Sequence, residues 1–163
     1  MKIFWILGSL IFLQSGVLAN PALDDLQTLM HQKEKTPITN TASPQQKNLS
    51  ENYYFVFIYK GSCPHCHNFA PVLKDFSAQF QVPVLAYSLD NEALPEFKGE
   101  PLTPELFQTF YINGGYNPTV PTLFLVNRHT LQAYAVLFGE AKDYELANRV
   151  NDLMLHIEDR FHD

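Results

Sequence analysis

The chain has 163 residues, of which 46% are hydrophobic and 17% are charged, and its formal net charge at pH 7 is −6. A chain of this length is expected to form one compact domain. Its apolar content, which includes 8 Tyr and 13 Phe, is sufficient for a buried core and excludes wholesale disorder. The acidic balance argues against nucleic acid as a partner.

Residues 1–19 have the pattern of a secretory signal peptide. Lys2 supplies a positive charge, the stretch from Ile3 to Leu13 is apolar, and Val17-Leu18-Ala19 offers a cleavage site. We therefore expect cleavage after Ala19 and export to the periplasm. The apolar stretch is shorter than the roughly 20 residues that span a bilayer, and an uncleaved N-terminal anchor is the alternative.

Residues 20–50 are predicted to form a short helix followed by a polar linker. From Pro21 to Lys33, apolar residues recur at helical spacing. From Glu34 to Asn52 the chain is polar and contains Pro37 and Pro44, a composition typical of a solvated linker. The compact domain is expected over residues 51–163.

The first half of that domain shows a strand, a helix and a second strand. Tyr53 to Tyr59 is a continuous aromatic and β-branched run, as expected for a strand buried on both faces. A helix is predicted from about Cys63 to Phe80, and a second strand from Val82 to Leu89. The apolar face of that helix is formed by residues three and four apart, namely Phe69, Val72, Leu73, Phe76 and Phe80.

The second half is predicted to contain a loop, a helix, a hairpin and a closing helix. The loop from Asp90 to Pro101 is followed by a helix that Thr103 caps and that reaches about Tyr111. Two strands, Thr122 to Val126 and Leu131 to Phe138, form the hairpin. The closing helix has an apolar face formed by Ala147, Val150, Met154, Ile157 and Phe161. The order of elements indicates an α/β domain.

The two cysteines of the chain both lie in the motif Cys63-Pro64-His65-Cys66, directly after the first strand. A cysteine at the start of a helix meets unpaired amide groups and the positive end of the helix dipole, which favour the thiolate. Cys63 is therefore the predicted nucleophile, and Cys66, one turn later, is the predicted resolving thiol. Pro64 and His65 are predicted to modulate the pair, His65 by adding positive charge or hydrogen bonds that stabilise the reduced thiolate and so make the disulfide more oxidising.

The motif also allows other interpretations. With His67 it matches the C-x-x-C-H pattern of haem c attachment, but it lies between a buried strand and an amphipathic helix. Zinc bound by both cysteines and two His would need a second ligand pair with finger spacing, which the chain lacks. An inert structural disulfide is the remaining alternative. We expect a redox-active dithiol with no cofactor and no metal.

Other polar residues are predicted to have no chemical role. His31, His129, His156 and His162 are expected at the surface, and His67 is expected to be solvated, with modulation of the thiolates as its alternative. The acidic residues of the loop after the second strand are expected to be solvated and to bind no metal. They are Asp90, Glu92, Glu96 and Glu100.

Several short motifs in order resemble the thioredoxin superfamily. They are the strand before Cys63, the C-x-x-C pair, Pro71, Val120-Pro121-Thr122 before a strand, and Phe138-Gly139 after the hairpin. The resemblance implies a thioredoxin-like fold with a central mixed sheet flanked by helices. It also implies that Pro121 is cis, faces the cysteines and, with Val120 and Thr122, binds the substrate. The Pro-His dipeptide is similar to that of periplasmic DsbA-type oxidases.

A narrower resemblance is carried by YKGSCPHCHNFAPVLKDF, by VPTLFLVN and by the leader. These segments resemble the pilin-assembly thiol-disulfide isomerases of F-type conjugative transfer systems (TrbB-like). That resemblance implies a periplasmic isomerase whose partners are cysteine-containing exported proteins of pilus and transfer assembly, together with a membrane redox partner. A DsbA-like oxidase and a non-catalytic assembly scaffold are the alternatives. Phe57 stands where thioredoxins carry a buried acid, so proton transfer from Cys66 needs water or another group.

Overall fold

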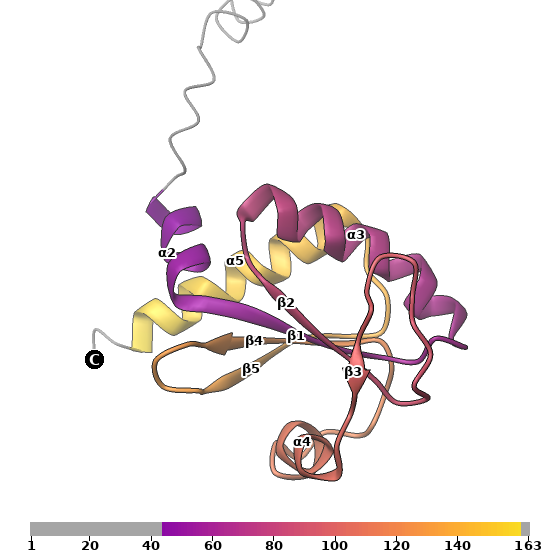
Figure 1. Ribbon diagram of the computed structural model, residues 1–163. Coiled ribbons are helices and arrows are strands. Elements are labelled where there is room, and N and C mark those ends of the chain that lie inside the picture. Colours follow the sequence, from indigo (N-terminus) through magenta and orange to yellow (C-terminus); the bar gives the residue numbers. More distant parts are fainter. Residues whose placement is uncertain (1–43, 161–163) are drawn as a thin grey trace, which may run out of the picture. The chain divides into compact units, whose positions relative to one another are not determined.

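The computed structural model describes residues 44–160 (Figure 1). The predicted signal peptide and the predicted helix from Pro21 to Lys33 lie outside these residues. The elements in chain order are α2 (Pro44–Asn52), β1 (Tyr53–Tyr59), α3 (Pro64–Phe80), β2 (Val84–Ser88), β3 (Glu100–Pro101), α4 (Pro104–Phe107), the π-helix η1 (Gln108–Ile112), β4 (Thr122–Asn127), β5 (Ala133–Phe138) and α5 (Asp143–Arg160).

The strands form one mixed sheet in the order β3-β2-β1-β4-β5. β1 pairs with β2 in parallel and with β4 in antiparallel orientation, and β4 and β5 form an antiparallel hairpin. The predicted first strand and the predicted hairpin are confirmed, and β1 is the central strand. This sheet, flanked by helices, is the thioredoxin-like fold that the sequence predicts.

Because successive side chains of a strand point to opposite faces, β1 contributes to two separate cores. Phe55, Phe57 and Tyr59 pack on the face covered by α3 and α5, whereas Val56 and Ile58 pack on the face covered by α4 and η1 (Figure 1). All five side chains are at most 2% exposed. Burial of each large apolar side chain stabilises the fold by about 1.5–3 kcal/mol, which is why this run is apolar throughout.

The helices α3 and α5 cover one face of the sheet with apolar side chains spaced by three and four residues. In α3 these include Phe69, Leu73 and Phe76, as predicted, while Val72 and Phe80 lie at the edge and are only partly buried. The predicted face of α5 is confirmed at Val150, Met154 and Ile157. Its first buried residue is Leu146, and the adjacent Ala147 is partly buried. Phe161 lies outside the described residues.

The prediction of a polar linker from Glu34 to Asn52 is wrong for its last nine residues, which form α2. α2 carries little apolar surface, and Leu49 is the side chain that anchors it in the core, at 4% exposure. Asn52 also accepts a hydrogen bond on its backbone carbonyl from the amide of Arg128, at the β4–β5 turn. One buried leucine in a polar sequence is too weak a pattern for a helix prediction.

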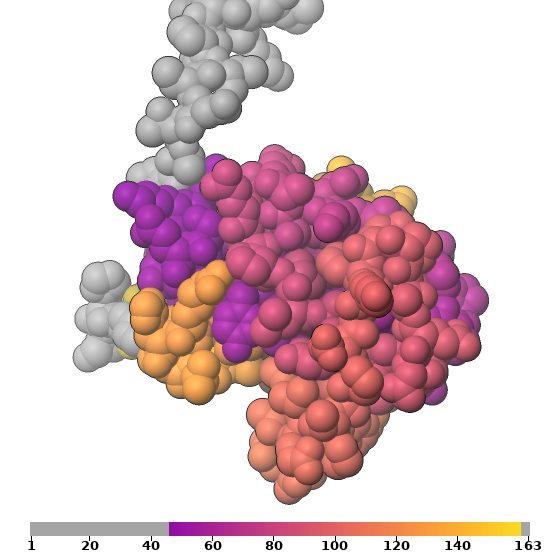
Figure 2. Space-filling model, in the orientation of Figure 1, coloured from indigo at the N-terminus to yellow at the C-terminus, as the bar shows by residue number. Residues whose placement is uncertain are grey.

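The segment between β2 and β4 contains two features that the sequence analysis did not predict. Glu100–Pro101 forms β3, a short parallel edge strand, within the region expected to be a loop. The predicted helix after Thr103 begins as expected, with the Thr103 hydroxyl accepting a hydrogen bond from the Leu106 amide at 3.3 Å. It then widens into η1, and Figure 2 shows this region as a lobe at the bottom of the view.

Within the part of the chain that the structure describes, no helix has both the length and the apolar character needed to cross a membrane.

Candidate active site

Cys63 lies at the N-cap of α3, where the turn after β1 becomes helical. Its backbone is extended (φ −91°, ψ 117°), and Pro64 occupies the first helical position. The Cys63 carbonyl accepts hydrogen bonds from the amides of Cys66 (3.1 Å) and His67 (3.2 Å), which close the first turn of the helix. Cys63 is half-buried. It therefore lies at the helix start, with part of its side chain accessible, as predicted for the attacking thiol.

Cys66 lies one turn inside α3 and is fully buried, at 0% exposure. The pKa of its thiol is raised to about 12, chiefly by burial and also by hydrogen bonding and charge from Cys63 and by the charge of Asp90. A backbone hydrogen bond at Lys60 acts in the opposite direction. The two sulfurs thus have different environments, because one is accessible and the other is shielded and favours its protonated form. Both cysteines are free thiols in this structure.

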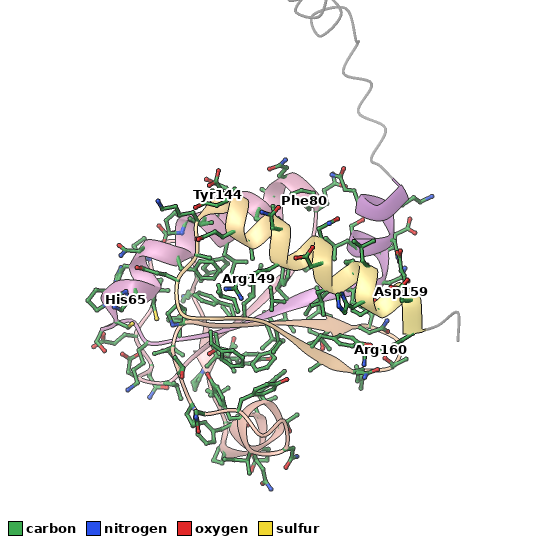
Figure 3. The ribbon with its side chains drawn as sticks, turned by 180° about the vertical axis from the view of Figure 1, so that it is seen from behind. His65, Phe80, Tyr144, Arg149, Asp159 and Arg160 are labelled. Carbon is green, nitrogen blue, oxygen red and sulfur yellow. The ribbon has the colours of Figure 1, made fainter. Side chains whose placement is uncertain are left out.

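Pro64 and His65 form the exposed rim of the motif. Figure 3 shows His65 at the end of α3 that lies away from Arg160 at the end of α5. Its Nδ1 is 3.2 Å from Oε2 of Glu140, in the segment between β5 and α5. The same Glu140 oxygen accepts a hydrogen bond from Asn68 at 3.0 Å. The sequence analysis predicted an effect of His65 on the thiols and did not predict Glu140 as its partner.

Glu140 is held by two neighbours on α3. The pKa of its carboxyl is lowered, first by the hydrogen bond from Asn68 and then by that of His65. Because His65 and Glu140 are both largely exposed, with side-chain exposures of 66% and 43%, water screens their attraction. The contact therefore orients the rim of the site more than it stabilises the fold.

The peptide bond between Val120 and Pro121 is cis, as the family resemblance implies. Thr122 opens β4 opposite Ile58, near the end of β1, so this loop reaches the edge of the sheet at which the cysteine motif begins. Pro121 and Thr122 are buried, while Val120 is partly exposed. The Pro121 carbonyl accepts a hydrogen bond from the Gly139 amide at 2.7 Å. A role of this loop in binding clients remains a prediction.

The loop after β2 contributes a carboxylate that the sequence analysis had treated as plain solvated surface. Asp90 accepts hydrogen bonds from the amides of Gly61 (2.9 Å) and Ser62 (3.0 Å), in the turn that leads to Cys63. A sequence signal for this contact exists, because the carboxyl ends of adjacent parallel strands meet at one edge of a sheet. Asp90 follows β2 and Ser62 follows β1, so their proximity was predictable once the two strands were paired.

The histidines outside the Pro-His pair divide into two groups. His67 is exposed, and its Nε2 lies 2.7 Å from the Gly61 carbonyl oxygen, so it links α3 to the preceding turn. His129 and His156 are exposed, as predicted, while His31 and His162 lie outside the described residues. Among residues 44–160, no three His, Cys, Asp or Glu side chains are grouped so that they could hold a metal ion.

Comparison with known proteins gives a family match and a similar protein. Residues 13–151 match the family described as TraF, F plasmid transfer operon protein. The chain is also 36% identical to protein TrbB of Escherichia coli (strain K12) over 113 residues, which are 68% of this chain and 60% of that protein. The matched region therefore spans less than two thirds of that relative.

Two solved structures are more distantly similar. One is a thiol:disulfide interchange protein of the thioredoxin family from Chlorobium tepidum TLS, with a TM-score of 0.49, 20% identity, and coverage of 67% of this chain and 84% of that one. The other is MTB dsbF in its mixed oxidised and reduced forms, with a TM-score of 0.46, 20% identity, and coverage of 66% and 84%. The fold described above rests instead on this chain's own strand order and helix positions.

Proposed function

Because the chain belongs to the TraF family of F plasmid transfer operon proteins, we propose that it is a protein thiol-disulfide oxidoreductase of a conjugative transfer system. The observation that carries this proposal is the unequal cysteine pair, in which Cys63 is half-buried at a helix N-cap and Cys66 is fully buried. One accessible and one shielded sulfur suit an exchange in which the first attacks a client and the second releases it.

In the proposed exchange, the Cys63 thiolate attacks one sulfur of a client disulfide. The client S–S bond breaks, its electron pair leaves on the second client sulfur, and a mixed disulfide with Cys63 forms. A client thiolate can then attack this mixed disulfide and expel Cys63, which rearranges the client without net electron transfer. Alternatively, Cys66 attacks the Cys63 sulfur, the client leaves reduced by two electrons, and a Cys63–Cys66 disulfide remains.

The environment of Cys66 favours the first route. Only a thiolate attacks a disulfide, and burial keeps Cys66 largely protonated because it raises the pKa of this thiol to about 12. Slow attack by Cys66 prolongs the mixed disulfide and leaves the client time to rearrange. We therefore propose a periplasmic disulfide isomerase of pilus and transfer proteins, kept reduced by a membrane redox partner. The Pro64-His65 dipeptide favours a DsbA-like oxidase as the second candidate.

Trapping of clients tests the covalent mechanism. A Cys66→Ala variant expressed with the transfer machinery should accumulate adducts that run high on non-reducing gels and collapse with reductant, because the release step is removed. Cys63→Ala is the matched control and should form no adducts, since the attacking sulfur is absent. If Cys66→Ala traps no exported protein, the covalent mechanism is wrong and an assembly scaffold becomes the better explanation.

The redox state of the pair in living cells separates the isomerase from the oxidase. Rapid acid quenching followed by alkylation of free thiols should find Cys63 and Cys66 mostly reduced, because an isomerase needs a free Cys63 thiolate. A pair that is mostly oxidised would instead assign the protein as an oxidase, with the same cysteines in the same order of attack.

A further inference from the structure

The carboxylate of Asp90 is bound to the turn before Cys63 by more than one kind of donor. Its Oδ2 accepts hydrogen bonds from the amide (3.0 Å) and the hydroxyl (2.8 Å) of Ser62. Its Oδ1 accepts from the Gly61 amide (2.9 Å), the Ser88 hydroxyl (2.9 Å) and the Glu92 amide (3.3 Å). These five donors come from the turn after β1, from the end of β2 and from the loop after it. One side chain therefore joins the ends of two adjacent strands.

The turn and the loop are also in close contact. Gly61 is buried, and a Cβ atom placed on it would lie 2.4 Å from Cβ of Glu92. The turn itself is closed by a hydrogen bond from the Cys63 amide to the Lys60 carbonyl, at 3.2 Å. With no side chain between them, the two segments approach closely enough for both Asp90 oxygens to reach the Gly61 and Ser62 amides. The backbone position of Cys63 thus depends on Asp90.

Each of these five donors is electrically neutral, so they orient the Asp90 carboxylate without cancelling its charge. The pKa of Asp90 is lowered despite the opposing effect of burial, because the hydrogen bonds from Ser62 and Gly61 favour the ionised form. The carboxylate is therefore negative at neutral pH. Because the carboxylate accepts hydrogen bonds from the amides of Gly61 and Ser62, the two residues directly before Cys63, its charge lies beside the cysteine motif, and it is one of the causes that raise the pKa of Cys66.

A fixed negative charge beside a dithiol disfavours the thiolate form. A dithiol whose thiolate is stabilised makes a strongly oxidising disulfide, because the reduced state is favoured. Asp90 acts in the opposite sense. We propose that Asp90 is a positioning residue that fixes the turn carrying Cys63. Through its negative charge, Asp90 also makes the Cys63–Cys66 pair more reducing, which means that it lowers the reduction potential of the pair. This inference deepens the proposed function and rests on it.

The test measures the redox equilibrium of the purified protein with glutathione. Asp90→Asn keeps one acceptor oxygen but removes the charge, so the equilibrium should shift by about threefold toward the reduced protein. Ser62→Ala combined with Ser88→Ala removes two donors and keeps the charge, and its equilibrium should match that of the unsubstituted protein. Asp75→Asn, which removes an exposed carboxylate on α3, is the matched control for charge alone and should also leave the equilibrium unchanged.

Asp90→Ser serves as a second neutral variant if Asp90→Asn does not fold, since its hydroxyl can still accept a hydrogen bond. An unchanged equilibrium in a folded, neutral variant would overturn the role of Asp90, and so would an equal shift in Asp75→Asn. Both results would leave the proposed function intact, because the unsubstituted protein would still exchange with glutathione. Failure of the unsubstituted protein to form a Cys63–Cys66 disulfide in any glutathione buffer would instead refute the proposed function.

Discussion

Two carboxylates contact the cysteine motif or the residues that flank it, and they are held in different ways. On one side, Asp90 is half-buried and accepts hydrogen bonds from backbone amides and serine hydroxyls. On the other side, Glu140 is exposed and contacts the imidazole of His65 and the amide group of Asn68. Asp90 therefore determines where the backbone before Cys63 lies. Glu140 contacts His65, whose effect on the thiols remains a prediction.

The two sides also differ in their response to conditions. Neutral donors bind a carboxylate over the whole pH range in which it stays ionised, so the Asp90 contacts are insensitive to pH near neutrality. The His65–Glu140 contact is an ion pair only while His65 is protonated, and it is exposed to screening by salt. The contacts of Asp90 are therefore constant near neutral pH, whereas the contact between Glu140 and His65 changes with the protonation of His65 and with salt.

A glycine near each carboxylate allows the two sides to be disrupted in a comparable way, and the larger effect is expected at Gly61. Gly61→Ala places Cβ against Cβ and backbone atoms of Glu92. These atoms cannot rotate away, so we expect a loss of about 3 kcal/mol in the free energy of unfolding. Gly139 has φ +99°, and a Cβ atom placed on it would meet nothing within 4 Å, so Gly139→Ala should cost only the backbone strain, about 1–2 kcal/mol.

Urea denaturation of the two alanine variants checks this order. Gly61→Ala should also slow the attack of Cys63 on a model disulfide, because the displaced turn carries Cys63, whereas Gly139→Ala should leave that rate nearly unchanged. If Gly139→Ala proves the more damaging of the two, the turn around Gly61 is more adaptable than its packing indicates.

Acid sensitivity is the second, smaller effect that distinguishes the two sides. The pKa of Asp90 is lowered in the folded protein, so its contribution to stability is present above the unfolded pKa of about 3.9 and is lost as the pH falls below it. Asp90→Asn lacks this group. Its free energy of unfolding should therefore be lower than that of the unsubstituted protein at pH 7 and should fall less steeply between about pH 5 and pH 2.

Denaturation at a series of acid pH values gives the measurement. Glu140→Gln is the comparison variant, because the pKa of Glu140 is lowered in the same direction but its side chain is exposed to solvent. Glu140→Gln should reduce the loss of unfolding free energy at acid pH by less than Asp90→Asn does. If the free energy of unfolding falls equally steeply with acid pH for Asp90→Asn and for the unsubstituted protein, the hydrogen bonds to Asp90 do not stabilise the folded state.

The parts of the molecule that could be predicted from sequence are those with a strong local pattern. The apolar run of β1 and the spacing of Phe69, Leu73 and Phe76 in α3 predict their elements correctly because each pattern is complete within one segment. The hydroxyl cap at Thr103 is predictable for the same reason. By contrast, α2 depends on Leu49 reaching a core formed by later segments, and its own sequence resembles a linker.

The residues of the site also divide into those that a local pattern predicts and those that depend on distant segments. Cys63 and Cys66 are recognisable because four consecutive residues contain the whole motif. Asp90 lies 28 residues from Ser62, and Glu140 lies 72 residues from Asn68. Their roles depend on strand pairing and on where the β5–α5 segment passes, which no local pattern contains. A search of the predicted strand ends for carboxylates was the one sequence route to Asp90, and none existed for Glu140.

The smallest expected effect concerns the contact between His65 and Glu140. A double-mutant cycle measures it. Glu140→Gln removes the charge that opposes His65, so the cysteine pair should become more oxidising, while His65→Ala should make it less oxidising because a group that favours the thiolate is lost. In the double variant, the effect of Glu140→Gln should disappear. Because both side chains are largely exposed, each change should shift the glutathione equilibrium by no more than about twofold.

The dependence of that cycle on salt supplies its control. The coupling between His65 and Glu140 should weaken in high salt, since exposed charges are screened within about 10 Å at 0.1 M ionic strength. Asn68→Ala removes the second contact of Glu140 and should reduce the coupling without abolishing it. Equal effects of Glu140→Gln with and without His65 would mean that the charge of Glu140 acts on the thiols directly and not through His65.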